Sequence, residues 1–212
     1  MSQHDDETER LIVYSDYLCP FCYLGKESME TYLDASETSL EIEWRPFDIQ
    51  GHKRGADGEL SEDVDDGKDE AYFERAKRNV QRLKEKYDVE MDLDLALDVD
   101  SWNAQKVALA VERQCDRSTF LALHDALFEA LWREGRDIGD PEVLLELAEE
   151  HGVDPDLVGE DIDDETLDEE LEAKFEQARQ TGIRGIPTFI YGEHITQGAV
   201  PPDHFARLLA MD

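Results

Sequence analysis

Cysteine is scarce in this chain, because its 212 residues contain only three. Small secreted proteins that rely on disulfides to stabilise a limited core carry many more, so three cysteines make a poor disulfide framework. A chain of this length can bury a sizeable hydrophobic core without such cross-links. Structural cross-linking is therefore a poor explanation for the cysteines that are present.

Long hydrophobic runs are also absent. No stretch of 18 apolar residues occurs, so we expect no membrane-spanning segment. The first ten residues, MSQHDDETER, are acidic and polar, which is the opposite of a secretory signal peptide. The sequence therefore predicts a cytoplasmic protein.

Basic residues are few: 21 Lys and Arg stand against 54 Asp and Glu, for a formal net charge of −33. This charge argues against nucleic acid as a partner. Because 40% of the residues are hydrophobic and show clear periodicity, it does not indicate disorder. The acidic residues are spread along the chain rather than collected in one tail. A distributed excess favours a surface adapted to molar salt, where charge repulsion is screened within about 3 Å. We therefore expect an extreme halophile as the source and unfolding at low salt.

The cysteines that carry most information form the motif Cys19-Pro20-Phe21-Cys22, which follows an apolar run and precedes a helical pattern. This context is typical of a redox dithiol. Pro20 suits the first position of a helix, which places Cys19 at the N-cap beside unpaired backbone N–H groups. The positive end of the helix dipole favours a thiolate there, and the thiolate is the attacking species in disulfide exchange. Cys22, one turn further on, is expected to be the more buried, resolving thiol.

A Cys-x-x-Cys motif can also form part of a zinc site or a structural disulfide. A zinc site needs two more ligands, but the remaining cysteine, Cys115, stands alone in a helical stretch and the six histidines show no paired spacing. A structural disulfide across two residues would constrain the unfolded chain very little. We therefore expect neither a metal nor another cofactor. Cys115 is expected to face the core as a small apolar residue.

A second motif, Gly185-Ile186-Pro187-Thr188-Phe189-Ile190, places a proline at the start of an apolar run. Proline cannot donate a hydrogen bond to a sheet, so the first residue of a strand is one of the few positions open to it. Taken alone, the motif indicates an ordinary strand-edge proline.

Together the two motifs resemble the DsbA-like thioredoxin superfamily and, within it, the FrnE-like branch of cytoplasmic dithiol oxidoreductases. The matching stretches are residues 14–25, 43–47, 127–145 in part, and 182–189. The resemblance implies that Pro187 is a cis-proline beside the dithiol helix. It also implies that the backbone of Ile186 lies against Cys19 and pairs with an extended substrate by strand addition. Pro20 and Phe21 would line the substrate site and tune the helix end.

The motif departs from its relatives at two positions. Phe21 stands where this branch often has Trp and the periplasmic relatives have a thiolate-stabilising His, so we expect a milder oxidant than those relatives. Thioredoxin-type relatives carry a buried carboxylate about six residues before the first cysteine, and this chain has Val13 there. Asp16 is nearer, but an aspartate at a strand end is more typical of a turn or cap.

The periodicity predicts an α/β protein whose sheet is interrupted by an α-helical insertion. The resemblance implies that this is a thioredoxin-like fold, with a central mixed sheet flanked by helices. We expect a discontinuous thioredoxin-like domain of residues 1–65 and 161–212 around an insertion of residues 66–160. Residues 51–69 are expected to form a solvated connection or, alternatively, a lid over the dithiol. The expected strands are 11–17, 40–47, 187–191 and 194–198, and the expected helices include 20–35, 201–210 and most of 66–181.

The function predicted from these features is a thiol–disulfide oxidoreductase or isomerase acting on protein or low-molecular-weight thiols. Cys19 would be the nucleophile and Cys22 the resolving thiol. A kappa-type glutathione transferase or hydroxychromene-carboxylate isomerase is an alternative, although these enzymes use Ser at the first motif position. A non-catalytic, redox-regulated binding module is another. A monomer and a homodimer are both compatible with the sequence.

Overall fold

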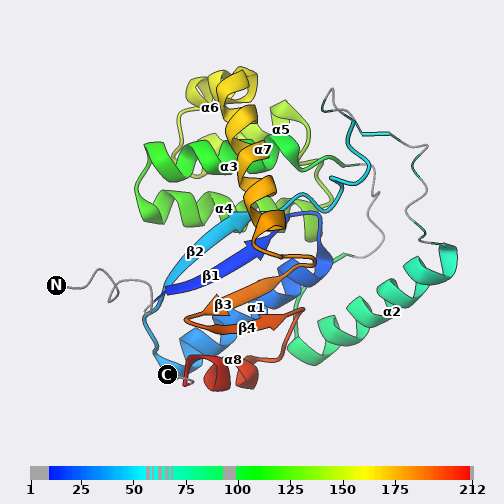
Figure 1. Cartoon of the computed structure of the whole chain (residues 1–212). Helices are drawn as coiled ribbons and strands as arrows, with labels where there is room; N and C mark the ends of the chain where they lie inside the picture. The colour runs from blue at the N-terminus through cyan, green and yellow to red at the C-terminus, as the bar shows by residue number, and fades with distance from the viewer. Residues whose placement is uncertain are drawn as a thin grey trace.

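The computed structural model describes residues 10–55, 58, 60–61, 64, 67, 69–92 and 99–210. Within these residues, one four-stranded sheet is combined with eight helices. Figure 1 shows the sheet between a lower layer, formed by α1 and α8, and an upper group formed by α3 to α7. The expected mixed sheet flanked by helices is confirmed.

The sheet joins the two ends of the chain. Its order is β2-β1-β3-β4, with β1 parallel to β2 and antiparallel to β3. Val13 on β1 faces Trp44 on one side and Phe189 on the other. The bounds are β1 Arg10–Ser15, β2 Glu41–Pro46, β3 Thr188–Tyr191 and β4 His194–Gln197.

Alternate residues of β1 face two different layers, as the period of a strand requires. Leu11 and Val13 belong to the main core, which includes helix α1 (Pro20–Ser36) and helix α8 (Pro202–Leu209). Tyr14 packs in a smaller cluster with Ala178 and Ile183 at the end of α7. Because both faces are covered, β1 is an almost entirely buried strand that fixes the position of α1.

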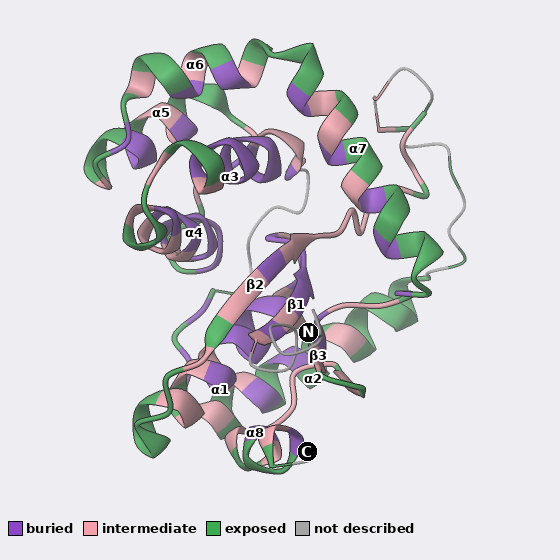
Figure 2. Cartoon of the chain, turned by 60° about the vertical axis from the view of Figure 1, so that its left-hand side comes forward, coloured by how far each residue is buried: buried purple, intermediate pink, exposed green. Residues whose placement is uncertain are grey.

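Most of the remaining helices pack on one another above the sheet. In Figure 2 the buried residues run through α3, where Ala104 to Val111 are all buried. Aspartates start several of these helices, and Asp116, Asp140 and Asp154 each accept a hydrogen bond from a backbone N–H of the first turn. The bounds are α3 Trp102–Gln114, α4 Arg117–Trp132, α5 Pro141–Glu150, α6 Pro155–Asp163 and α7 Glu165–Gln180.

Helix α2 (Glu70–Tyr87) packs beside α1, and only its second half is well covered. Its buried residues are Val80 and Leu83, whereas Tyr72 and Phe73 are 43% and 48% exposed. The apolar spacing therefore predicted the helix correctly, but packing against α1 buries only part of its apolar face.

The predicted helical character of 66–181 is confirmed where residues are described, and strand ends differ by one or two residues. The predicted domain boundary after residue 160 falls inside α6, and the division into two domains stays a prediction. The predicted connection contains no named helix or strand among its described residues, but Arg54 anchors it by ion pairs with Asp48 and Asp100.

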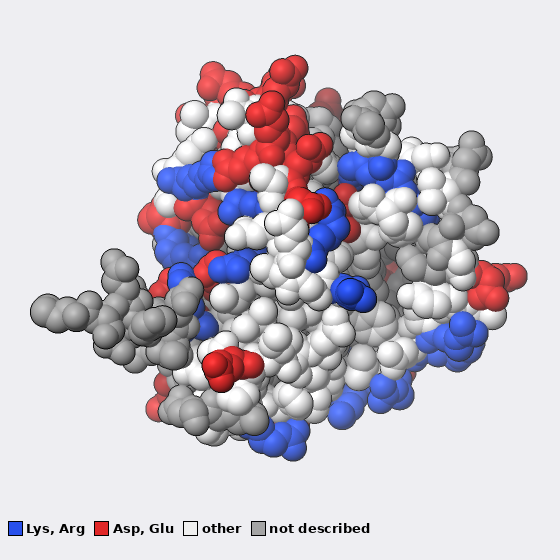
Figure 3. All heavy atoms as spheres, in the orientation of Figure 1, with Lys and Arg blue, Asp and Glu red and all other residues white. Residues whose placement is uncertain are grey.

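Charge is unevenly distributed over the surface. On the face shown in Figure 3, Asp and Glu side chains crowd over α6 and α7, while Lys and Arg gather at the lower right, where α2 lies in Figure 1. None of the helices in the described residues is long and apolar enough to cross a membrane.

Candidate functional site

The dithiol lies at the start of α1, directly beyond the end of β1. Cys19 is the N-cap residue and Pro20 the first helical residue, as the motif predicted. The Cys19 amide donates to Asp16 O at 3.1 Å, and the Cys22 amide donates to Cys19 O at 2.9 Å. These bonds hold the motif in a tight turn that places Cys19 at the N-terminal end of the helix, at the positive end of the helix dipole.

The two thiols are alike in exposure, since Cys19 and Cys22 are both only 2% exposed. The expectation that Cys22 is the more buried therefore does not hold at the level of whole residues. Burial raises the pKa of Cys22 well above its ordinary value, and interaction with Cys19 raises it further. The Ser15 hydroxyl and the Asp16 backbone counter this increase only in part. Cys22 is thus a protonated thiol at neutral pH, in keeping with a resolving position.

The segment before β3 lies against Cys19. The Ile186–Pro187 bond is cis, and the Cys19 thiol donates to Ile186 O at 3.8 Å. Gly25 on α1 permits this arrangement, because a Cβ there would be 3.0 Å from Pro187 Cγ. The structure thus brings Ile186 and Pro187 to the dithiol, 167 residues away in sequence, as the resemblance implied.

The other residues expected at the site are close to it by virtue of the motif itself. Pro20 and Phe21 are half-buried, and Phe21 packs against the main core. Cys115 is the C-cap of α3 and is half-buried against the main core, as expected of a residue that faces the core. Within the described residues, no group of three or more His, Cys, Asp or Glu is placed to hold a metal ion.

Asp16, which follows β1, is buried beside the dithiol and is 1% exposed. Its carboxylate accepts from Leu18 N at 3.0 Å, which is the expected turn, and also from Ile49 N at 2.9 Å and Ser101 Oγ at 2.7 Å. Burial raises the pKa of Asp16 to about 6, although these hydrogen bonds lower it. The turn interpretation was correct but incomplete, because sequence alone did not show that this carboxyl is enclosed.

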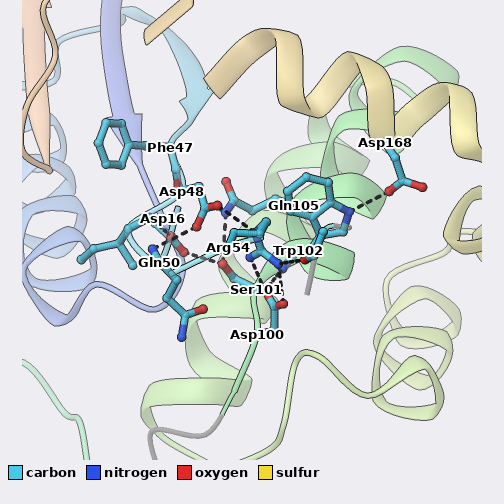
Figure 4. A network of polar contacts seen from close by, with 12 residues as sticks. Asp16, Phe47, Asp48, Gln50, Arg54, Asp100, Ser101, Trp102, Gln105 and Asp168 are labelled. Carbon is cyan, nitrogen blue, oxygen red and sulfur yellow. Dashed lines mark hydrogen bonds and ion pairs between the residues drawn. The ribbon is translucent and has the colours of Figure 1, made fainter. Parts of the chain in front are cut away.

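Figure 4 shows how polar contacts continue from Asp16 into the helical layer. Gln105 Nε2 donates to Ser101 Oγ at 3.1 Å, so the dithiol turn is tied to α3. Nearby, Arg54 pairs with Asp100 at 2.9 Å and lies 4.5 Å from the ring centre of Trp102. The network therefore fixes the start of α3 against the end of β1.

A cavity of about 40 Å³ lies on the other side of this network, between the ends of β1 and β2 and helices α3 and α4. An aromatic cluster borders it, in which Tyr17 Oη is 2.8 Å from His124 Nδ1 and the Trp44 ring lies tilted over the His124 ring, with 4.3 Å between the ring centres. Burial lowers the pKa of His124 well below its ordinary value, so the imidazole is neutral. Sequence reasoning missed this cluster, because its members come from distant segments of the chain. A larger hollow of about 1000 Å³ runs along α2, and neither motif cysteine lines it.

Several solved structures share this fold over most of the chain. A probable DsbA oxidoreductase from Streptomyces coelicolor is 23% identical, with a TM-score of 0.75 over 94% of this chain and 88% of its own. A 2-hydroxychromene-2-carboxylate isomerase is 19% identical, with a TM-score of 0.73 over 93% and 91%. The cytosolic disulfide reductase DsbM from Pseudomonas aeruginosa, solved with GSH, is 21% identical, with a TM-score of 0.63 over 94% and 96%.

These similarities confirm the thioredoxin-like architecture predicted from the two motifs. The described elements, from the first residue of β1 to the end of α8, coincide with the span of one family model. That model, the DSBA-like thioredoxin domain, matches residues 10–210, and the chain belongs to this family.

Proposed function

We propose that the protein is a thiol–disulfide oxidoreductase whose redox centre is the Cys19–Cys22 pair. The observation that carries this proposal is the contact of Cys19 Sγ with Ile186 O at the N-terminal end of α1. It combines a site that favours a thiolate with a stretch of backbone beside the reacting sulfur. Membership of the DsbA-like family supports the same chemistry.

The reaction would proceed in two exchange steps. The Cys19 thiolate attacks one sulfur of a substrate disulfide and forms a mixed disulfide, which releases the other substrate sulfur. Cys22 then loses its proton and attacks Cys19 Sγ, which releases the first substrate sulfur and leaves a Cys19–Cys22 disulfide. Run in reverse, the same steps oxidise a substrate dithiol. The Ile186 backbone would orient an extended substrate in either direction.

The direct test is the reduction potential of the pair in molar salt, measured by thiol alkylation and mass at a series of redox-buffer ratios. We expect a reversible two-electron couple that disappears in Cys19→Ser and in Cys22→Ser and persists in the control Cys115→Ser. A potential near about −120 mV would indicate an oxidant, and one near about −270 mV a reductant. Absence of any reversible disulfide would refute the proposal.

Substrate and compartment are finer parts of this proposal. We propose protein or low-molecular-weight thiols as substrates and the cytoplasm as the compartment, in line with the FrnE-like branch. The similarity to a cytosolic reductase solved with GSH supports this choice. Exchange of the Cys19–Cys22 disulfide with GSH, compared with exchange with a reduced unfolded protein, would rank the two substrate classes.

An isomerase-like enzyme is the second candidate, favoured by the similarity to the 2-hydroxychromene-2-carboxylate isomerase structure. Isomerase activity that survives Cys22→Ser would support it, because that chemistry does not need a resolving thiol. The binding-module alternative predicts a pair that oxidises but does not exchange with protein disulfides. Turnover of a disulfide substrate would eliminate it.

Adaptation to high salt is proposed on the net charge of −33 and the acidic surface over α6 and α7. Molar KCl screens repulsion between these carboxylates, so the melting temperature should rise steeply from dilute buffer to molar KCl. An unchanged melting temperature would sink this part of the proposal.

A further inference from the structure

Four buried polar atoms converge on the cavity between the sheet and helices α3 and α4. Trp44 Nε1, Gln105 Oε1 and His124 Nε2 have no hydrogen-bond partner among the described residues, and Ser15 Oγ has none there besides its interaction with the Cys22 thiol. A buried polar group left unsatisfied costs about 1–3 kcal/mol, so native proteins rarely collect several in one place. Their convergence points to a polar ligand that bonds to all of them.

The chemistry of these atoms identifies the ligand class. The Trp44 indole can only donate, the Gln105 carbonyl can only accept, and a hydroxyl and an imidazole can do either. A ligand that both donates and accepts is therefore required. The cavity volume of about 40 Å³ accommodates about three water molecules, at roughly 10–15 Å³ each. Water meets both conditions, whereas a larger organic ligand does not fit.

The walls of the cavity include buried residues beside the dithiol and half-buried residues nearer the surface. At its inner end is Ser15, whose hydroxyl lies close enough to Cys22 to interact with the sulfur. Gln105 provides a second link, because its amide nitrogen donates to Ser101, which in turn donates to Asp16. At the outer end the walls include the half-buried Arg45 and Glu112. A water cluster here would span the distance from a buried thiol to solvent.

We propose that this cavity binds a cluster of water molecules and that Ser15 relays the proton of the Cys22 thiol to it. The inference rests on the proposed function, since it concerns the resolving step. The Cys22 S–H bond breaks and its proton passes through the Ser15 hydroxyl to water. The Cys22 sulfur then attacks Cys19 Sγ, and the bond from Cys19 to the substrate breaks. The substrate sulfur leaves with the electron pair and takes a proton from solvent, while the two cysteines become the disulfide.

Several titratable groups face this route and would shape its pH dependence. Cys19 and Asp16 lie beside Cys22, from α1 and the end of β1. The cavity is lined by Tyr17 just after β1, Arg45 on β2, Glu112 on α3 and His124 on α4. Ser15 is the residue through which the relay is tested, because its hydroxyl can be removed without changing any of these charges.

The test uses an aromatic disulfide such as 5,5′-dithiobis(2-nitrobenzoate) with the reduced protein in molar KCl. Attack by Cys19 releases a first coloured thiol, and attack by Cys22 releases the second. In Ser15→Ala we expect the second release to slow at least about 100-fold, the lower end of the range typical of a lost proton-transfer group, and its pH profile to move to higher pH. The first release should stay unchanged. Ser15→Thr, which keeps the hydroxyl, should restore both the rate and the profile.

Ser28→Ala is the matched control. Ser28 is also buried, on the same helix as Cys22, but its hydroxyl donates to Val200 O at 2.7 Å and does not line the cavity. Ala108→Leu, which fills the cavity from α3, should slow the second release like Ser15→Ala. A second release in Ser15→Ala that matches Ser28→Ala in rate and pH profile would overturn the relay while leaving the proposed function intact. A wild-type protein that gives no second release would overturn the proposed function itself.

Discussion

Helices α1 and α2 are nearly equal in length, at 17 and 18 residues, yet they differ greatly in how many of their residues are buried. Seven residues of α1 are buried, including Cys22 and Met29, whereas α2 buries only Val80 and Leu83. Helix α1 is enclosed by the sheet, α4 and α8, and it carries the dithiol. Burial is therefore concentrated in the helix whose start brings Cys19 to Ile186. Helical periodicity alone does not show how much of a helix is buried.

The largest expected difference comes from shortening an apolar side chain in each helix. Met29 is fully buried, so Met29→Ala should destabilise the protein by about 2–5 kcal/mol through lost burial and a cavity. Phe73 is 48% exposed, and Phe73→Ala should cost less than about 1 kcal/mol. Denaturant unfolding in molar salt measures both. Similar losses in the two variants would break the comparison and show that the first half of α2 is covered in solution.

The carboxyl before α1 gives the next largest effect. The folded pKa of Asp16, about 6, lies above the ordinary 3.8, so the folded state holds its proton more tightly than the unfolded state. Its contribution to stability is therefore present below about pH 4 and is lost as the pH rises to about 6. The loss should amount to about 3 kcal/mol at 1.36 kcal/mol per pKa unit. Asp16→Asn should lack this decline when unfolding free energies are compared across pH 4–7.

An exposed aspartate provides the opposite case. Hydrogen bonds from Ser118 and the Thr119 backbone lower the pKa of Asp116, which caps α4. Its stabilisation is present at neutral pH and is lost as the pH falls through the lowered pKa. The difference between wild type and Asp116→Asn should thus shrink toward low pH, whereas that for Asp16→Asn changes in the range above pH 4. Identical pH profiles for the two variants would contradict the assignment.

The close packing of the Pro187 segment against Gly25 on α1 can be tested by substituting two glycines. Gly25→Ala would place a Cβ 3.0 Å from Pro187 Cγ and 3.2 Å from Phe189, and it should cost about 1–3 kcal/mol by overpacking. Gly159→Ala in α6 meets only Leu145 at 3.9 Å, so it should stabilise the helix by up to about 1 kcal/mol. Thermal unfolding shows whether each substitution lowers or raises the stability of the protein. A neutral Gly25→Ala would mean that the Pro187 segment moves away without cost.

The smallest effect contrasts two ion pairs spaced four residues apart. Lys26 on α1 is 4% exposed and pairs at 2.9 Å with both Glu30 and Asp125, and these carboxylates raise its pKa although burial lowers it. Lys26→Met should cost about 1–2 kcal/mol, less than a fully buried pair because its partners are partly exposed. On α2, Arg78 and Glu74 are 67% and 61% exposed, and Arg78→Met should cost less than about 0.5 kcal/mol. Only the second loss should vanish in molar salt.

The local part of the site was predictable, because it depends on neighbours in sequence. Two residues between Cys19 and Cys22, with Pro20 at the first helical position, specify the turn wherever the chain is placed. A proline opening an apolar run gave the position of Pro187, since few places in a sheet accept it. The fold and the contact with Ile186 came from the family resemblance that these two motifs carry, because the proline motif taken alone indicates only a strand-edge proline.

The rest depended on which faces meet in three dimensions. Asp16 is enclosed because Ile49 and Ser101 come to it from distant segments, and nothing in the spacing indicates this. The same applies to His124, whose partner Tyr17 is 107 residues away. Periodicity indicated a helix at residues 70–87 but could not show that Tyr72 on it stays 43% exposed. The burial of polar groups and the exposure of apolar ones were thus the features that could not be predicted from the sequence.

The pairing of Val13 with Phe189 has a consequence for how the protein is made. During synthesis both motif cysteines leave the ribosome long before β3 exists, so α1 lacks the strand and the α8 layer that enclose it. The chain must close a loop of most of its length before the dithiol is buried, and contacts of such high order form slowly. In a nascent chain Cys19 and Cys22 are therefore accessible to cellular oxidants. The initial redox state of the pair is determined before folding buries the two thiols.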